Sequence, residues 1–271
     1  MHILRALFLA VILAGSCWFE FAQDHSANEL WQIARDQSDP RPARRILMLG
    51  NSRLYGNDMP GMLRHIADSA RAPEKYEVTM IAPGGASFQS LSDDWRVERE
   101  VGQPWDDAVF QGESRGQSST EQAANFMAAG ANLIGSVHPR HARPLLIVNW
   151  AYDRALYTDA DNRSDSSAVD QGRADHYRMI QQAHDELARR TGAHAVNVGK
   201  VWEYLHANLP GVPLTTDGNH PTVAASYFVA LCLYSDLSGG NVAAVQWAPD
   251  SLSPDNAAQI RELVDRYRAD L

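Results

Sequence analysis

The sequence is poor in cysteine and has no array of metal-ligand residues, which narrows the classes of protein it can belong to. Only two of its 271 residues are cysteines. Cys17 falls in an apolar N-terminal segment, so we expect no disulfide within the folded domain. Cys232 lies in an apolar helical run and is expected to be a small buried hydrophobic residue. Cysteine and histidine do not occur at the spacing of a metal cluster, and we predict no metal and no cofactor.

The sequence also lacks a cluster of positive charge. It holds 24 lysine and arginine residues against 33 acidic residues, which gives a formal net charge of -9. Proteins that bind the phosphate backbone of nucleic acids present a basic stripe, and none is found here. We therefore expect no nucleic-acid partner.

Long apolar runs are missing except at the N-terminus. Residues 1–22 contain Arg5, an apolar stretch over residues 6–14 and small residues before Cys17, which is typical of an export signal and short for a membrane span. The sequence "LAGSC" (residues 13–17) resembles a bacterial lipobox, although Ala14 stands where that motif usually has leucine. Lipidation of Cys17, ordinary cleavage and an uncleaved anchor all remain open. Each places the domain in the periplasm or outside the cell, with membrane contact only through this N-terminus.

The remaining chain has alternating strand-like and helix-like segments. Residues 23–43 are polar and read as a lead-in that could hold a short helix, and the domain is expected over residues 44–271. The strand-like runs are 45–50, 76–82, 107–112, 144–150 and 194–199. The helical segments are 60–69, 118–137, 169–191, 201–208, 222–238 and the C-terminal stretch from Ser253. This alternation predicts one domain, a three-layer α/β/α sandwich around a five-stranded parallel sheet.

Four polar stretches follow predicted strands or lie in the last loop, where a parallel sheet binds its ligands. They are "GNS" (50–52), "PGGAS" (83–87), "QGES" (111–114) and "DGNHP" (217–221). Their order and spacing resemble the sequence blocks of the SGNH/GDSL hydrolase superfamily, over most of the chain from about residue 45 to residue 237. The resemblance implies a flavodoxin-like fold and hydrolysis of carboxylic esters without a cofactor.

Three of these residues have the chemistry of a serine hydrolase. A serine hydroxyl needs a base within hydrogen-bond reach and a third group to orient that base. Ser52 is the expected nucleophile, His220 the base and Asp217 the orienting carboxylate, and the resemblance implies the same roles. Taken alone, Ser52 would be read as a helix N-cap and Asp217 as a turn residue.

The negative charge that develops on the attacked carbonyl oxygen needs hydrogen-bond donors. We expect the backbone N–H groups of Ser52 and Gly85 to supply two of them. The family's third donor is an asparagine side chain, but here Ser114 stands at that position, so Gln111 or Ser114 is predicted to replace it.

Two further residues are assigned to the substrate side of the site. Asn51 replaces the aspartate usual in this family and keeps a short polar side chain that can brace the turn. Trp150 ends a predicted strand at the catalytic edge and is expected to line the pocket, because aromatic faces pack against sugar rings.

Two alternative ion sites are weaker interpretations. His138 and His141 lie in a basic, proline-containing connection that is more simply a solvated loop. The acidic stretch 159–170 has the spacing of a calcium loop, but it lacks the central glycine and the final glutamate, so a charged loop before a helix explains it better.

The sequence thus predicts an exported serine esterase that acts on small acyl groups carried by carbohydrates. Two alternatives stay open. One is a catalytically impaired glycan-binding homologue, suggested by the missing asparagine. The other is an acyltransferase that uses the same three residues. The acyl chain length, the alcohol part of the substrate and the oligomeric state are left undetermined.

Overall fold

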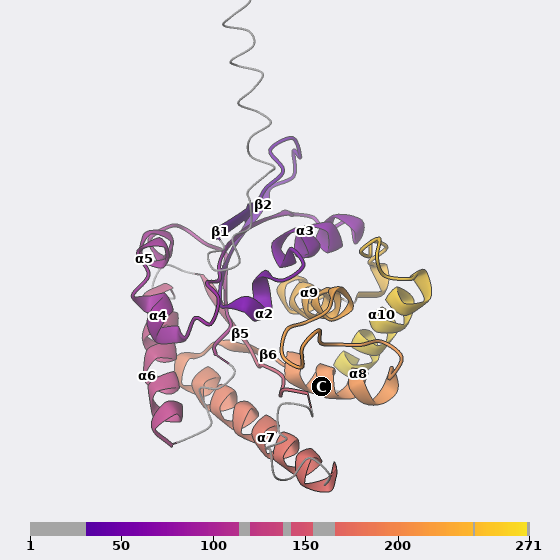
Figure 1. The fold of residues 1–271 in the computed structure, drawn as a ribbon. Coiled ribbons are helices and arrows are strands. Elements are labelled where there is room, and N and C mark those ends of the chain that lie inside the picture. Colours follow the sequence, from indigo (N-terminus) through magenta and orange to yellow (C-terminus); the bar gives the residue numbers. More distant parts are fainter. Residues whose placement is uncertain (1–30, 114–119, 138–141, 154–165, 241, 270–271) are drawn as a thin grey trace, which may run out of the picture.

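A computed structural model describes residues 31–113, 120–137, 142–153, 166–240 and 242–269. One sheet lies between two layers of helices (Figure 1). Residues 1–30, which include the predicted export signal and Cys17, lie outside the described part, and so do the 138–141 connection and most of the acidic stretch 159–170. Among the residues that the structure describes, no helix is both long and apolar enough to cross a membrane.

The sheet has six strands in the order β1-β3-β2-β4-β5-β6. Neighbours from β3 to β6 pair in parallel, whereas β1 pairs antiparallel with β3. The strands are β1 (Trp31–Ala34), β2 (Ala43–Leu49), β3 (Lys75–Ile81), β4 (Asp107–Phe110), β5 (Arg143–Ile147) and β6 (His194–Val196). The five predicted parallel strands are confirmed, and their order is the flavodoxin-like one.

The prediction of a purely parallel, five-stranded sheet was wrong by one strand. β1 lies in the segment expected to be a polar lead-in, where a short helix was considered. Four residues in polar surroundings carry little periodic signal, and this strand depends on pairing with β3 and on packing of Trp31 against the core.

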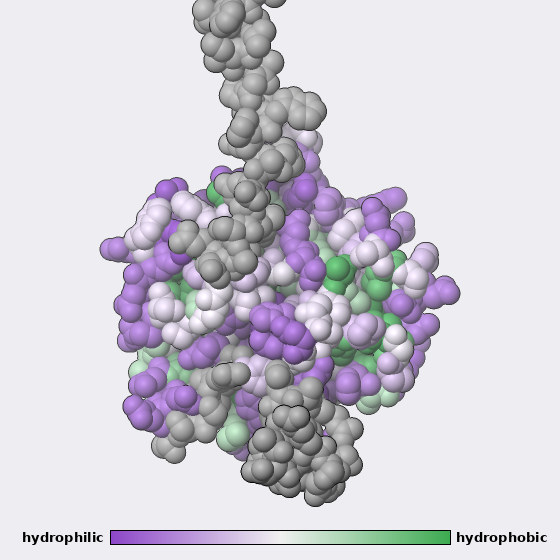
Figure 2. Space-filling view, viewed as in Figure 1, coloured by the Kyte–Doolittle hydropathy of each residue, from purple (hydrophilic) through white to green (hydrophobic). Residues whose placement is uncertain are grey.

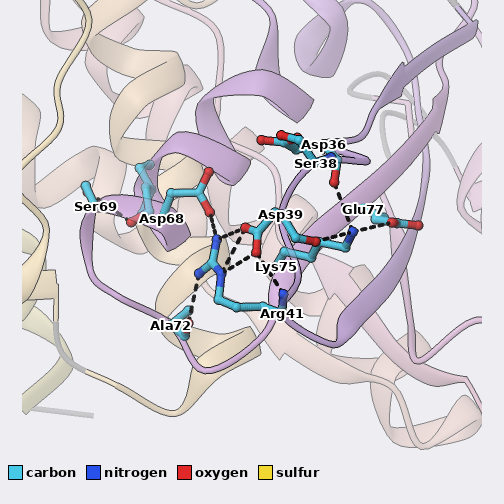
Figure 3. Close-up of polar contacts among 10 residues, drawn as sticks. Asp36, Ser38, Asp39, Arg41, Asp68, Ser69, Ala72, Lys75 and Glu77 are labelled. Atoms are coloured by element: carbon cyan, nitrogen blue, oxygen red, sulfur yellow. Dashed lines mark hydrogen bonds and ion pairs between the residues drawn. The ribbon is translucent and has the colours of Figure 1, made fainter.

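Polar contacts fix the connection from β1 to β2 onto the domain (Figure 3). The Arg41 guanidinium bonds the carboxylates of Asp39 and Asp68 and donates to the carbonyl of Ala72 at 2.9 Å. Lys75 donates to the carbonyl of Asp39 at 3.0 Å. These bonds tie the connection to both α3 (Met59–Ser69) and β3, so β1 is held as part of the sheet.

The helices form two layers, one on each face of the sheet. In Figure 1, α3 (Met59–Ser69), α8 (Val198–Asn208), α9 (Val223–Ser238) and α10 (Pro254–Ala269) lie on one side, and α4 (Phe88–Ser92), α5 (Trp95–Val101) and α6 (Thr120–Val137) lie on the other. α7 (Ser166–Thr191) packs against α6. Each layer encloses its own apolar cluster. The surface seen in Figure 2 is mainly hydrophilic, as expected for helices that turn their apolar faces to the sheet.

The predicted long helices are present, but two short ones were missed. α4 and α5 occupy the connection between β3 and β4, where no helix was predicted. Both begin at polar N-caps, Ser87 and Asp94, in stretches too short to show a helical period. Cys232 lies buried in α9, as expected.

The strand order places the candidate site. From β2 the chain moves first to β3 on one side, and β4 then follows on the other side. Ligands in open α/β sheets bind beyond the carboxyl ends of the strands where the order reverses in this way. The stretches that follow β2, β3 and β4 meet at this edge.

Candidate active site

Ser52 is the first residue of α2 (Ser52–Tyr55), directly after the turn that follows β2. Asn51 caps this short helix, and its side chain accepts a hydrogen bond from the N–H of Arg53 at 3.2 Å. The turn passes close to its neighbours, because a Cβ at Gly50 would lie 2.6 Å from Leu54 Cδ1 and 2.8 Å from Gln111 Oε1. Glycine at position 50 therefore lets the chain reverse tightly and leaves Ser52 at the sheet edge.

The structure brings together the three residues predicted to form the reactive group. His220 Nε2 lies 3.0 Å from Ser52 Oγ, and His220 Nδ1 lies 2.6 Å from Asp217 Oδ2. A carboxylate beside Nδ1 favours the tautomer with a proton on that nitrogen, which leaves Nε2 free to accept the proton of the Ser52 hydroxyl. This is the arrangement in which a serine can be activated.

Asp217 is held in its ionised form by hydrogen bonds. Its Oδ1 accepts from the backbone N–H of His220 at 2.8 Å and from that of Asn219 at 3.0 Å. The backbone bond from His220 is the largest cause that lowers the pKa of Asp217 to about 2, and the bond from the His220 side chain adds to it. Asp217 is therefore a carboxylate at neutral pH and can stabilise a positive charge on the imidazole.

The loop that carries Asp217 and His220 is closed on itself. Thr216 N–H donates to the carbonyl of His220 at 2.9 Å, and Thr222 N–H donates to the carbonyl of Leu214 at 3.0 Å. The Thr222 side chain then caps α9. Gly218, with φ of +84°, provides the left-handed turn that the loop needs.

The backbone N–H groups of Ser52 and Gly85 are the two donors predicted for the site. Neither the N–H of Ser52 nor that of Gly85 donates to an acceptor within the described ranges. Gly85 is exposed and has φ of +70°, a conformation that favours glycine. Asn51 Nδ2 donates to the carbonyl of Ala86 at 3.1 Å, which ties the Gly85 loop to the serine turn. Both predicted backbone donors are thus available to an incoming ligand.

Gln111 does not supply the third donor in this structure. Its side chain is fully buried, and its Oε1 accepts from Asn51 N–H at 3.0 Å. Its Nε2 donates to the carbonyl of Gly112 and to Asn149 Oδ1. Both ends of the amide are used to hold the backbone, which corrects this half of the prediction. Ser114, the other candidate, lies outside the described residues.

The predictions for Asn51 and Trp150 as substrate contacts also need correction. Asn51 is 5% exposed and uses its side chain within the turn, so it braces the site as an internal residue. Trp150 is fully buried, stacks on Trp202 with ring centroids 4.2 Å apart, and donates from Nε1 to the carbonyl of Asn219 at 3.2 Å. Trp150 lies three residues after the end of β5 and supports the histidine loop from within the core.

Three residues near the site were not predicted. Arg53 contacts Asn219, and Asn149 donates to the carbonyl of Gly112 at 2.8 Å. Their only sequence signal is their place, since Arg53 follows the serine, Asn219 precedes the histidine and Asn149 is the last residue but one of a strand-like run. No group of three or more potential metal ligands is found within the described ranges.

Solved structures with the same fold were found by comparison. A DUF4886 family protein from Bacteroides uniformis superposes with a TM-score of 0.65 at 16% identity, covering 84% of this chain and 95% of its own. A protein from Slackia heliotrinireducens assigned to the SGNH hydrolases gives a TM-score of 0.53 at 25% identity, covering 73% and 100%. The acetylxylan esterase Axe2 from Geobacillus stearothermophilus gives 0.54 at 14% identity, covering 78% and 98%.

Sequence comparison alone finds no such relationship, since no family model and no curated protein matches this chain. The similarity lies in the fold, and the chain therefore has the fold of the SGNH hydrolases. The match at 25% identity supports a relationship to that superfamily.

Proposed function

We propose that this protein is a serine esterase in which Ser52, His220 and Asp217 act as the catalytic triad. The observation that carries the proposal is the pair of contacts on the His220 ring, 3.0 Å to Ser52 Oγ and 2.6 Å to Asp217 Oδ2. These residues come from two segments 168 positions apart, so the contacts depend on the fold.

The geometry supports a two-step reaction. The Ser52 hydroxyl attacks the ester carbonyl carbon while its proton passes to His220 Nε2, and the N–H groups of Ser52 and Gly85 bind the oxygen that becomes negative. The imidazolium, stabilised by Asp217, returns the proton to the departing alcohol. A water molecule then attacks the acyl-serine in the same manner and releases the acid.

The neighbours support a small acyl group on a carbohydrate as the substrate. Acetyl xylan esterases are among the proteins with this fold. Short-chain and sugar acetates are therefore the first substrates to test.

The test uses a fluorophosphonate probe and p-nitrophenyl esters of increasing acyl length. Wild type should be labelled and should release nitrophenol, whereas Ser52→Ala should show neither. Ser136→Ala is the matched control, because Ser136 bonds only within α6, to the carbonyl of Leu133. Labelling with turnover only in the presence of an acceptor alcohol would indicate an acyltransferase. Absence of both in wild type would indicate a binding protein.

The engaged state of Gln111 is the specific observation that favours the binding alternative. Loss of one oxyanion donor costs on the order of 10² to 10³ in rate. Measured turnover of acetyl esters near that of ordinary esterases would show that the donors present suffice.

We further propose that residues 1–22 export the domain. Cell fractionation would test this, and Cys17→Ala tests lipidation, since a lipoprotein variant without this cysteine should leave the membrane fraction.

A further inference from the structure

An arginine beside the proposed nucleophile is buried and joined to the histidine loop. Arg53 is 1% exposed. Its Nε and Nη2 both donate to Asn219 Oδ1, at 2.9 Å and 2.8 Å, and its Nη1 donates to the carbonyl of Trp150 at 2.8 Å. Arg53 directly follows Ser52, and Asn219 directly precedes His220. One side chain therefore links the two segments that must meet for the reaction.

Aromatic rings hold the guanidinium group of Arg53 in place. Its central carbon lies 4.5 Å from the centroid of the Trp150 ring and 5.1 Å from that of the Tyr152 ring. Trp150 in turn is nearly parallel to Trp202, with an interplanar angle of 4°. Cation–π contacts of this kind strengthen when water is excluded. The aromatic rings of the core thus help to fix the position of the guanidinium group.

Asn219 is held at three atoms. Its side-chain oxygen accepts from Arg53, and its carbonyl oxygen accepts from Trp150 Nε1 at 3.2 Å. Its backbone N–H donates to Asp217 Oδ1 at 3.0 Å. Fixing this residue fixes the spacing between Asp217 and His220, because it lies between them in the loop.

We propose that Arg53 is a positioning residue that sets the place of His220 relative to Ser52 by holding Asn219. The inference rests on the proposed esterase function, since it concerns the same three residues. Arg53 is shielded from the substrate, so it acts through Asn219 and not on the reacting atoms. A planar fork with donors on two edges suits this task, whereas the ammonium group of lysine presents a single point charge. Displacement of a catalytic group by about 1 Å can cost on the order of 10² in rate.

Kinetics of Arg53→Gln, Asn219→Ala and the double variant test this proposal. Each single variant should lower kcat about 10- to 100-fold, with KM for p-nitrophenyl acetate within about threefold of wild type. The kcat of the double variant should be no more than about threefold below that of the less active single variant, because both substitutions remove the same contact. Arg53→Lys should recover part of the activity of Arg53→Gln.

Arg143→Gln is the matched control for lost stability. Arg143 makes three similar contacts, to Asp107 and to the carbonyls of Asp236 and Leu237, at the opposite edge of the sheet. It should lower the melting temperature but leave kcat within about twofold. Equal losses of kcat in Arg143→Gln and Arg53→Gln, or additive losses in the double variant, would overturn the proposal.

A readout independent of turnover separates this proposal from the proposed function. The proton between His220 Nδ1 and Asp217 should give a downfield NMR signal that is absent in His220→Gln. We expect the signal to shift or vanish in Arg53→Gln and Asn219→Ala and to persist in Arg143→Gln. Persistence in the first two variants would contradict positioning by Arg53. Presence of the signal in a wild-type protein that hydrolyses no ester, with its loss in Arg53→Gln and Asn219→Ala, would refute the esterase function alone.

Discussion

The buried polar groups at the two ends of strand β4 differ in charge, since those at the amino end are ionised and those at the carboxyl end are neutral. At its amino end, Asp107 is fully buried and accepts from Arg44 Nε at 2.6 Å and from Arg143 Nε at 2.8 Å. At its carboxyl end, Gln111 and Asn149 are equally buried but neutral, and both donate to the carbonyl of Gly112.

The difference indicates that the amino end of β4 serves the stability of the fold, whereas the carboxyl end supports the candidate site. The charges at the amino end are satisfied by one another, so this end can only hold strands β2, β4 and β5 together. At the carboxyl end neutral amides fix the backbone and leave the charge of Asp217 to act on His220. A strong field from a buried carboxylate near His220 would compete with that interaction. The comparison predicts that variants at one end change the rate and variants at the other change the free energy of unfolding.

The largest effect is expected from Asp217→Asn. The amide keeps the shape of the loop, but it can favour the wrong tautomer of His220, and kcat should fall by about 10⁴-fold. The free energy of unfolding should change by less than about 1 kcal/mol, because the Asp217 side chain is 54% exposed. Steady-state kinetics and urea unfolding of the same preparation measure both quantities. A large loss of stability with unchanged kcat would reverse the comparison.

Asp107→Ala should give the opposite result. Removing the buried carboxylate takes away the partner that Arg44 and Arg143 share. Because both arginines are partly exposed and keep other partners, the loss should be about 1 to 3 kcal/mol of unfolding free energy. The kcat of the protein that remains folded should stay within about twofold of wild type. Asp93→Ala, which removes a carboxylate bound only by the exposed Gln89 side chain, is the matched control and should change little. A loss of kcat beyond tenfold in folded Asp107→Ala would show that the two ends are coupled.

Gln111→Met should affect both quantities, because the amides at this end are buried and also support the serine turn. The N–H of Asn51 and the oxygen of Asn149 lose their partner, which costs about 1 to 3 kcal/mol. A shift of the turn should also lower kcat by about tenfold. If stability falls and kcat does not, the amides serve the fold alone.

The smallest effect is expected from His184 on α7, another buried polar residue. Its Nδ1 lies 2.7 Å from the carbonyl of Ile180, and its Nε2 has no hydrogen-bond partner among the described residues. Burial lowers the pKa of His184 from 6.5 to about 4. The unfolded chain therefore binds more protons than the folded one between these values, so stability falls as pH decreases from about 6.5 towards 4. His184 should contribute a loss of about 1 kcal/mol between pH 7 and pH 5.5.

Comparison with His184→Leu by urea unfolding at several pH values isolates this contribution. The variant should lose that part of the pH dependence and keep the pH profile of kcat. Asp217, with a pKa of about 2, stays ionised throughout this range and is not affected by the substitution. An unchanged slope of stability against pH would contradict the assignment to His184.

Prediction from sequence succeeded where the signal was local. The apolar run before Gly50 gave β2, and "DGNHP" before an apolar helix gave the loop with Asp217 and His220. It failed where the role of a side chain depends on what surrounds it. Gln111 looked like a free donor, but the fold turns its amide inward to Asn51 and Asn149. Short elements such as β1 were missed because four residues cannot display a period.

Trp150 and Arg53 are two further residues whose surroundings could not be predicted from the sequence. An aromatic residue at the end of a predicted strand is compatible with either a pocket wall or a core position. Only its packing against Trp202 shows that Trp150 is a core residue. Arginine is rarely buried without partners, so residue type alone predicts that an arginine after a serine is exposed. The partners of Arg53 come from residues 97 and 166 positions away in the chain.

The sequence by itself determined the strands of the parallel sheet, the long helices and the identity of the residues that can activate a serine, because periodicity and residue chemistry are local properties. Only the tertiary structure decided that Ser52 and His220 meet, that Trp150 and Gln111 face inward, and that Arg53 joins the two loops. These outcomes depend on which strand ends lie side by side, and strand order is set by packing of the whole chain.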